Sequence, residues 1–345
     1  MAVIFMDGFD TYATADRFKR WTAALGTGEA SFPWQCGPAY ARSPAGQGFG
    51  MTTAGTDKGI YKSFGTNYTA GLYGVATFVP SGSLASKILL TVMDGVTEQC
   101  SIRTNASSVL TVTQGGTVKA TGTTVLSAGV WYYIEFKYTV HQSTGIAQVK
   151  LNGAAEIAST SSLDLTGTAN NYWNAISLGD ISTSLIRYHD DLYLLDTTTG
   201  DNTDFLGPVR VVAISPSAPG NASSWTPNGG TNYGAVSEQY ADGDATFNQS
   251  STANQIDTFI MQDLPADSGS VYAVQTLLTA RQDAGAARTI APVLRPAATD
   301  RVGTTVALSA SYQILPQIYD LNPEDSAAWA TTDVAGMEVG YKLIS

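Results

Sequence analysis

The residues of this sequence that could do chemistry are mainly carboxylates, and three of the candidates stand together as His189, Asp190 and Asp191. On a regular strand, His189 and Asp191 would share one side of the sheet and Asp190 would face the other. Carboxylate oxygens at a sheet rim can bind calcium. The alternative, which we prefer, is that these carboxylates accept hydrogen bonds from neighbouring strands or loop amides.

The sequence predicts no catalytic or metal-binding residues. A retaining glycosidase needs two carboxylates about 5–5.5 Å apart, whereas the seven glutamates here are widely separated and form no Glu-x-Asp-x-x-Glu motif. There is no Gly-x-Ser-x-Gly elbow and no phosphate-binding Gly-rich loop. Two histidines and two distant cysteines give no zinc spacing. We therefore expect no enzyme and no cofactor, with calcium as the one alternative.

Aromatic and amide side chains offer a second kind of chemistry, because they can stack on sugars and hydrogen-bond to hydroxyl groups, or anchor a protein interface. Two Asn-rich segments combine them, around residues 170–174 and 223–238. The candidate glycan or interface residues are Tyr172, Trp173, Asn174, Trp225, Asn228, Asn232 and Tyr233. Core packing, a protein interface and a glycan site all stay open for these rings.

The elements that must position these residues are strands. In Trp131–Tyr138, alternation places Tyr132, Ile134, Phe136 and Tyr138 on one face, which indicates a strand with one buried face. A second alternating run over 146–151 ends at Asn152-Gly153, and this dipeptide favours the two positive-φ positions of a type I′ hairpin. The pattern is similar to the late strands of a laminin-G or concanavalin-like jelly roll.

Further strands and turns divide the chain into two β domains. The first contains runs at 72–79, 88–93, 98–103, 109–113, 117–120, 175–178 and 186–196, and the last of these is expected beside the first strand. Residues 196–204 (DTTTGDNTD) form a turn-rich boundary. The second contains runs at 209–214, 258–264, 271–281, 288–294, 304–314 and 337–344. A long polar stretch at 220–255 is predicted to be a loop that is either functional or disordered.

Composition agrees with an all-β chain and excludes some partners. The 345 residues exceed what one core usually organises. Only 14% of residues are charged and the net charge is −11, so no basic surface is available for nucleic acid, and an anionic membrane is disfavoured. We expect no signal peptide and no membrane insertion. Cys36 and Cys100 could pair if the fold joins them, but free thiols are the preferred interpretation.

Several segments together resemble a family of tailed-bacteriophage virion structural proteins. They are FMDGFDTY at 5–12, RYHDDLYLLD at 187–196, FLGPVRVV at 205–212, SSWTPNGGTNYGAVSE at 223–238 and LNPEDSAAWATTDVAGMEVGYKL at 321–343. The resemblance covers nearly the full length through loose motifs. It implies a concanavalin or laminin-G-like jelly roll over 1–204 and a second, smaller β-sandwich over 205–345 for virion docking or oligomerisation.

The function implied is a non-enzymatic part of the phage virion, at the tail tip or fibre or on the capsid surface, for assembly or adhesion. The expected partners are other virion proteins and further copies of the chain, with a trimer as one form. The protein would be made in the host cytoplasm and located in the virion. The alternatives are a lectin-like module for host surface glycan and, third, a capsule polysaccharide hydrolase.

Overall fold

The computed structural model describes residues 2–25, 34–43, 46–51, 58–180, 186–283, 285 and 287–345. The chain is all-β and divides into two compact units, Met1–Val211 and Val212–Ser345. The sequence predicted a boundary after residue 204, seven residues earlier. The difference arises because residues 205–211 lie on the first unit, as described below.

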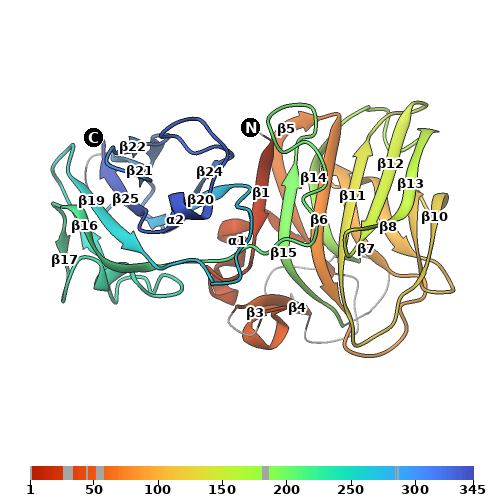
Figure 1. Ribbon diagram of the computed structural model, residues 1–345, viewed down its shortest axis with the longest axis horizontal. Helices are drawn as coiled ribbons and strands as arrows, with labels where there is room; N and C mark the ends of the chain where they lie inside the picture. The colour runs from red at the N-terminus through yellow and green to blue at the C-terminus, as the bar shows by residue number, and fades with distance from the viewer. Residues whose placement is uncertain are drawn as a thin grey trace. The chain divides into compact units, whose positions relative to one another are not determined.

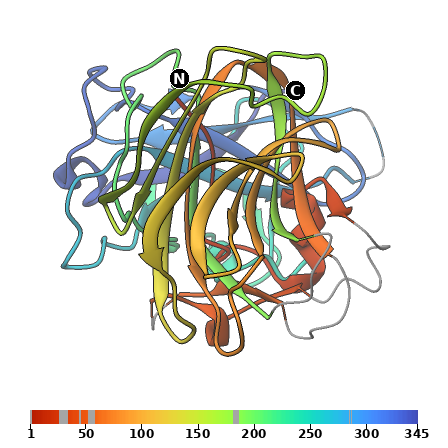
Figure 2. The same ribbon diagram turned by 90° about the vertical axis from the view of Figure 1, so that its right-hand side faces the viewer.

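The first unit is a concanavalin-like jelly-roll sandwich of two antiparallel sheets (Figures 1 and 2). Sheet A has the order β13 (Ala154–Leu163), β12 (Gly145–Leu151), β11 (Trp131–Thr139), β6 (Ala70–Phe78), β15 (Tyr188–Leu195), β4 (Gly48–Met51) and β3 (Trp34–Gly37), with β1 (Val3–Asp7) also paired to β15. Sheet B has the order β10 (Thr117–Val125), β9 (Val109–Gln114), β8 (Thr97–Thr104), β7 (Ile88–Asp94), β14 (Trp173–Asp180), β5 (Lys58–Tyr68) and β2 (Ala23–Leu25).

Two predictions about this unit are confirmed. The strand that contains His189 returns beside the first strand, with Met6 opposite Tyr193. The turn after β12 has φ of 52° at Asn152 and 81° at Gly153, the positive values that an Asn-Gly hairpin requires.

The core lies between the two sheets. Apart from Arg187, its largest fully buried side chains are aromatic and include Trp21, Trp34, Tyr73, Tyr138 and Trp173. Cys36 and Cys100 are free thiols, Cys100 buried and Cys36 half-buried, and burial raises the pKa of both.

One expectation about β11 is wrong. The alternation predicted a single buried face, but Tyr133 and Glu135 on the opposite face are 2% and 0% exposed. The reason is that residues 204–211 cross this outer face of sheet A. The amide of Gly207 donates to Glu135 at 2.9 Å, and Asp204 pairs with Lys137 at 3.1 Å. We call residues 204–211 the strap.

The second unit is a smaller β-sandwich. A six-stranded sheet has the order β16 (Pro216–Ser223), β19 (Ile256–Met261), β25 (Glu338–Leu343), β21 (Thr289–Arg295) and β22 (Arg301–Val302), with β23 (Val306–Ala307) also on β21. Two further pairs are β20 (Val274–Ala280) with β24 (Gln313–Tyr319), and β17 (Thr226–Pro227) with β18 (Asn248–Gln249). Leu294, Trp329 and Met337 centre its core, beside the short helix α2 (Thr331–Val334).

Three sequence predictions for this unit differ from the structure. Residues 209–214 form no strand, because the strap contacts fix 209–211 on the first unit. The run predicted at 304–314 is two strands, β23 and β24. The polar stretch at 220–255 is not one long loop, since it carries part of β16 together with β17 and β18. The strand β16 was not predicted because it contains Pro216 and Pro219. Both prolines are tolerated there because β16 is an edge strand that, among the described residues, pairs with β19 alone.

Candidate functional site

A row of polar side chains crosses the ends of three neighbouring strands of sheet B. Asn67 stands near the end of β5, Asn174 at the start of β14 and Asp94 at the end of β7, and these strands are adjacent in the order β5, β14, β7. The Asn174 Nδ2 donates to Asn67 Oδ1 at 3.1 Å and to Asp94 Oδ1 at 3.3 Å. Because β14 is antiparallel to both neighbours, its first residues meet their last ones. We call these three residues the polar row.

The loop that leads into β14 folds over the same carboxylate. Thr168 Oγ1 and Asn170 Nδ2 donate to Asp94 Oδ2 at 3.0 and 2.8 Å. The Asn170 amide also donates to the hydroxyl of Tyr172 at 2.9 Å. Asp94 therefore accepts hydrogen bonds at both oxygens, so its orientation is fixed.

Gln99 on β8 is fully buried and hydrogen-bonds to this loop from the side of the protein interior. Its Nε2 donates to the carbonyl of Tyr172 at 2.7 Å and to Thr168 Oγ1 at 3.1 Å. Its Oε1 accepts from the amides of Gly167 and Thr168 at 2.6 and 3.2 Å. One buried side chain thus holds the loop in a single conformation.

The polar row reaches the protein surface. Asn67 is exposed, Asp94, Asn174 and Tyr172 are half-buried, and Val96 at the tip of the neighbouring hairpin is 72% exposed. The amide of Gly95 donates to Asn174 Oδ1 at 2.7 Å, so the hairpin tip is tied to the row. The result is a preorganised surface of amides, a carboxylate and a phenol.

Three of the residues singled out from the sequence lie here. Tyr172 and Asn174 belong to this surface, whereas Trp173 between them points into the core and is 0% exposed. Its ring stacks on Tyr68 at 4.9 Å and meets Tyr138 edge-on at 5.6 Å. Alternation along β14 explains this, because neighbouring residues face opposite sides. Trp173 is therefore a packing residue in this structure.

The other four sequence candidates lie in the second unit, and three of them, Trp225, Asn228 and Asn232, hydrogen-bond to backbone groups of that unit. Trp225 is half-buried, packs on Tyr341 at 4.7 Å and donates to the carbonyl of Gln255. Asn232 donates to the Trp225 carbonyl at 2.8 Å. Asn228 is exposed, and its side chain joins the backbone of residues 245 and 247. Tyr233 is half-buried and precedes a short 3-10 turn.

The sequence placed Asn170 only in an Asn-rich segment and missed Asn67, Asp94, Gln99 and Thr168. These five residues are separated by up to 103 positions and share no motif. The one local signal was at Asp94, which directly follows the mainly apolar run 88–93.

A second polar cluster surrounds Asp190 and Asp191. The prediction that they point to opposite faces is wrong, because Asp191 has φ of 54° and the register with β6 shifts after Asp190. Both carboxylates therefore meet Arg42: its backbone amide donates to Asp190 at 2.7 Å, and its guanidinium to Asp191 at 2.9 Å. Asp10 lies near and accepts the amide of Gln47.

Burial governs protonation in this cluster. Removal from water raises the pKa of Asp10 to about 7, and the nearby Asp191 charge adds to this. Burial, followed by the charge of Asp191, also raises the pKa of Asp190. The pKa of Asp191 is raised by burial against the opposing effects of the Val211 amide and Arg42. His189 is buried, which lowers the pKa of its imidazole well below its usual range.

The described residues of the two clusters include no set of metal ligands. Within the described residues, no group of three or more His, Cys, Asp or Glu side chains is placed to hold a metal ion. The calcium alternative for Asp190 and Asp191 therefore gains no geometric support. The hydrogen bonds to Arg42 and loop amides are those of the interpretation that we preferred.

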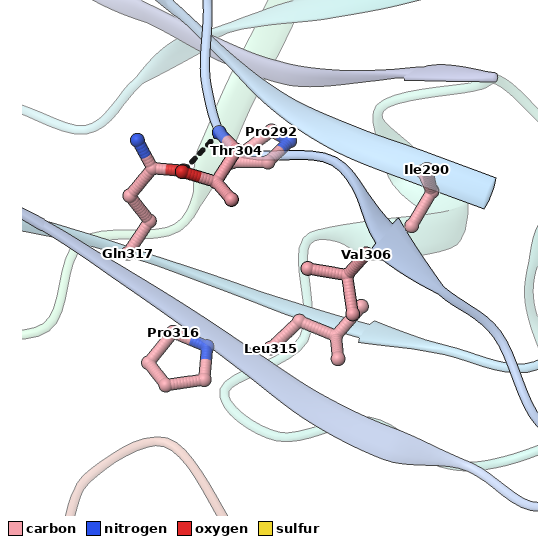
Figure 3. Close-up of a pocket in the computed structure, with 7 residues that line it drawn as sticks. All are labelled: Ile290, Pro292, Thr304, Val306, Leu315, Pro316 and Gln317. Carbon is pink, nitrogen blue, oxygen red and sulfur yellow. Dashed lines mark hydrogen bonds between the residues drawn. The ribbon is translucent and has the colours of Figure 1, made fainter. Parts of the chain in front are cut away.

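A cavity of ≈ 200 Å³ in the second unit has little chemistry to offer. Its wall is mostly apolar, as Figure 3 shows, and consists of Ile290, Pro292, Thr304, Val306, Leu315, Pro316 and Gln317. Its two polar side chains belong to Gln317, whose Oε1 accepts the amide of Thr304 at 2.7 Å, and to Thr304 itself.

No helix of the described residues is long and apolar enough to cross a membrane.

Comparison with known proteins gave structural neighbours only. No family model and no curated protein sequence matches this chain. A glycoside hydrolase family 131 catalytic domain from Coprinopsis cinerea is similar at 15% identity over 60% of this chain and 99% of that one (TM-score 0.39). The family 131 β-glucanase domain from Podospora anserina is similar at 13% identity over 56% of this chain and 95% of that one (TM-score 0.38).

Trypanosoma rangeli sialidase is similar at 12% identity over 43% of this chain, with a TM-score of 0.33. The match spans only 25% of the sialidase. These comparisons contradict the expected function, a non-enzymatic phage virion component, because the named structures are glycoside hydrolases. The statement that the chain is not an enzyme is corrected on the same finding.

Proposed function

We propose that the first unit is a carbohydrate-active domain that binds a neutral glycan at the polar row. The observation that carries the proposal is the continuous hydrogen-bonded set of Asn67, Asn174 and Asp94 across three strand ends, open to solvent at Asn67. Planar amides and carboxylates can pair with adjacent hydroxyl groups of a sugar, and their fixed orientation lowers the entropic cost of binding.

The charge of the row favours a neutral ligand. Asp94 brings one negative charge, and the nearby Glu98 is paired with Arg103 at 2.7 Å. An acidic sugar would place its own carboxylate beside Asp94, where like charges repel. The half-buried ring of Tyr172 supplies an apolar edge against which a sugar C–H face can pack.

The support for a neutral glycan comes from this chain's own side chains in the polar row. An array of neutral and acidic oligosaccharides, probed with the full chain, tests the proposal. We expect binding to neutral glycans that falls at least tenfold in Asn67→Ala and Asp94→Asn. Asn221→Ala, which removes an exposed amide from β16 in the second unit, serves as the control. Absence of any neutral glycan binding, or equal binding by all variants, would refute it.

A further inference from the structure

The outer face of sheet A holds a buried acceptor that the protein itself does not satisfy. Glu135 is 0% exposed, and within the described residues its Oε2 has no hydrogen-bond partner. Its Oε1 accepts from the Tyr193 hydroxyl at 2.5 Å and from the Gly207 amide at 2.9 Å. An unpaired buried carboxylate oxygen is costly, so this position points to a missing donor.

The backbone of the strap beside Glu135 does not supply that donor. Gly207 already uses its one amide on Oε1, and the next residue, Pro208, has no N–H. The neighbouring amide of Leu206 donates to the Tyr193 hydroxyl at 3.3 Å. A sugar ring, in contrast, presents adjacent hydroxyl groups that can donate to both oxygens of one carboxylate.

The rest of the face has the same character. The rings of Tyr133 and Tyr193 stack at 6.4 Å, and Arg42 lies 5.1 Å from the Tyr133 ring. Arg42 also donates to the carbonyl of Val209 at 2.9 Å, while Asp191 accepts the amide of Val211 at 2.9 Å. Aromatic rings beside an arginine and two carboxylates suit a polysaccharide chain.

The contacts that hold the strap on this face are mainly hydrogen bonds, an ion pair and cation–π contacts. Phe205 lies 4.5 Å from the Lys150 ammonium and stays half-buried, and Pro208 and Arg210 are exposed. Gly207 has φ of 81°, a conformation that favours glycine. A segment with so little buried apolar surface can open locally at low cost.

We propose that the outer face of sheet A is a second neutral-glycan site, with Glu135 as its central acceptor, and that the strap is a lid that occupies it. This site lies on sheet A, whereas the polar row lies on sheet B, so the proposal does not depend on glycan binding at the polar row. A glycan would displace the strap and fill both oxygens of Glu135.

The test compares Gly207→Pro and Phe205→Ala with the control Gly200→Pro, in an Asn67→Ala background that weakens the polar row. Gly207→Pro forbids the positive φ and removes the amide donor. Gly200→Pro strains another positive-φ glycine outside the strap. We expect tryptic cleavage after Arg210 to accelerate at least tenfold in the two strap variants, and their native-gel migration to be retarded by laminarin, dextran or pullulan. Adding Glu135→Ala should abolish the retardation.

A measurement on the unaltered chain keeps the proposal testable even if the variants misfold. Hydrogen exchange at the Gly207 and Val211 amides should speed up when a retarding polysaccharide is added, because the glycan displaces the strap. A freed strap without retardation would overturn the proposal. So would a strap that stays protected in both variants, or exchange that polysaccharide leaves unchanged.

Discussion

Glu135 and Tyr193 meet across Gly74. Gly74 on β6 is the register partner of Glu135 on one side and of Tyr193 on the other. A Cβ atom at Gly74 would lie 2.2 Å from the Tyr193 ring, so only glycine lets the tyrosine cross β6 to the carboxylate. This one contact links three strands of sheet A and buries Glu135 beneath the strap.

Gly74→Ala should therefore destabilise the first unit. The added methyl forces the Tyr193 ring away and breaks its bond to Glu135, which we expect to cost about 2–4 kcal/mol of unfolding free energy. Urea unfolding followed by tryptophan fluorescence measures this. Thr69→Ala, at an exposed site between β5 and β6, is the control and should change stability by less than about 0.5 kcal/mol. Equal stability of Gly74→Ala and the control would contradict the packing described.

The stability of the first unit should fall as pH rises, in part through Asp10. Its pKa is about 7 in the folded chain, above the ordinary 3.8, so the folded state binds the proton more tightly than the unfolded state. The stabilisation from this group is complete below about pH 4 and is lost as pH rises through 7.

Asp10→Asn should remove that part of the pH dependence while still accepting the Gln47 amide. Unfolding free energies at pH 5 and pH 8 test this, with Asp201→Asn as an exposed control for the loss of one charge. The variant should lose less stability than the wild type between the two pH values. An unchanged difference between pH 5 and pH 8 in Asp10→Asn would show that the carboxyl does not titrate as described.

Trp173 and its neighbour Tyr172 should behave differently on truncation. Trp173→Ala opens a cavity between Tyr68 and Tyr138 and should cost about 3–5 kcal/mol. Tyr172→Ala should cost much less and weaken glycan binding instead. Thermal unfolding and array binding of both variants give the comparison. A stable Trp173→Ala protein would mean that the ring is not a core element.

Gln99→Ala tests how the loop before β14 is held. The variant loses donors and acceptors for Gly167, Thr168 and Tyr172 and should be destabilised by about 3 kcal/mol. Gln114→Ala, which removes a single bond to the Thr166 carbonyl, should cost only about 1 kcal/mol. Unfolding in urea separates the two. If both variants lose the same stability, Gln99 is not the anchor of this loop.

The sequence predicted most of the first unit's framework because local patterns encode it. Alternation identified β11 and β12, and Asn152-Gly153 identified the turn between β12 and β13. The second unit was harder. Its strand β16 contains two prolines, and the short β23 carries too few residues for a period to be seen.

The site was largely out of reach from sequence alone. Tyr172 and Asn174 were identified from the sequence as candidate binding residues. Asn67 and Asp94 lie beside Asn174 because β5 and β7 are the neighbours of β14 in the sheet, and no local sequence pattern encodes that strand order. The bulge at Asp191 was equally hidden, since a positive φ at a non-glycine residue is imposed by tertiary contacts. The burial of Glu135 depends on a segment some 70 residues later in the chain.

The most direct test of the central claim is a calorimetric titration of the strongest neutral glycan from the array into wild type and Asp94→Asn. Asp94→Asn keeps the shape of the side chain, removes its charge and replaces one acceptor oxygen by an NH2 donor. We predict that the dissociation constant of the variant rises at least tenfold, which is about 1.4 kcal/mol of binding free energy, and that the variant stays folded with a loss of about 1–3 kcal/mol of unfolding free energy. Equal affinity of the two proteins would contradict glycan binding at the polar row.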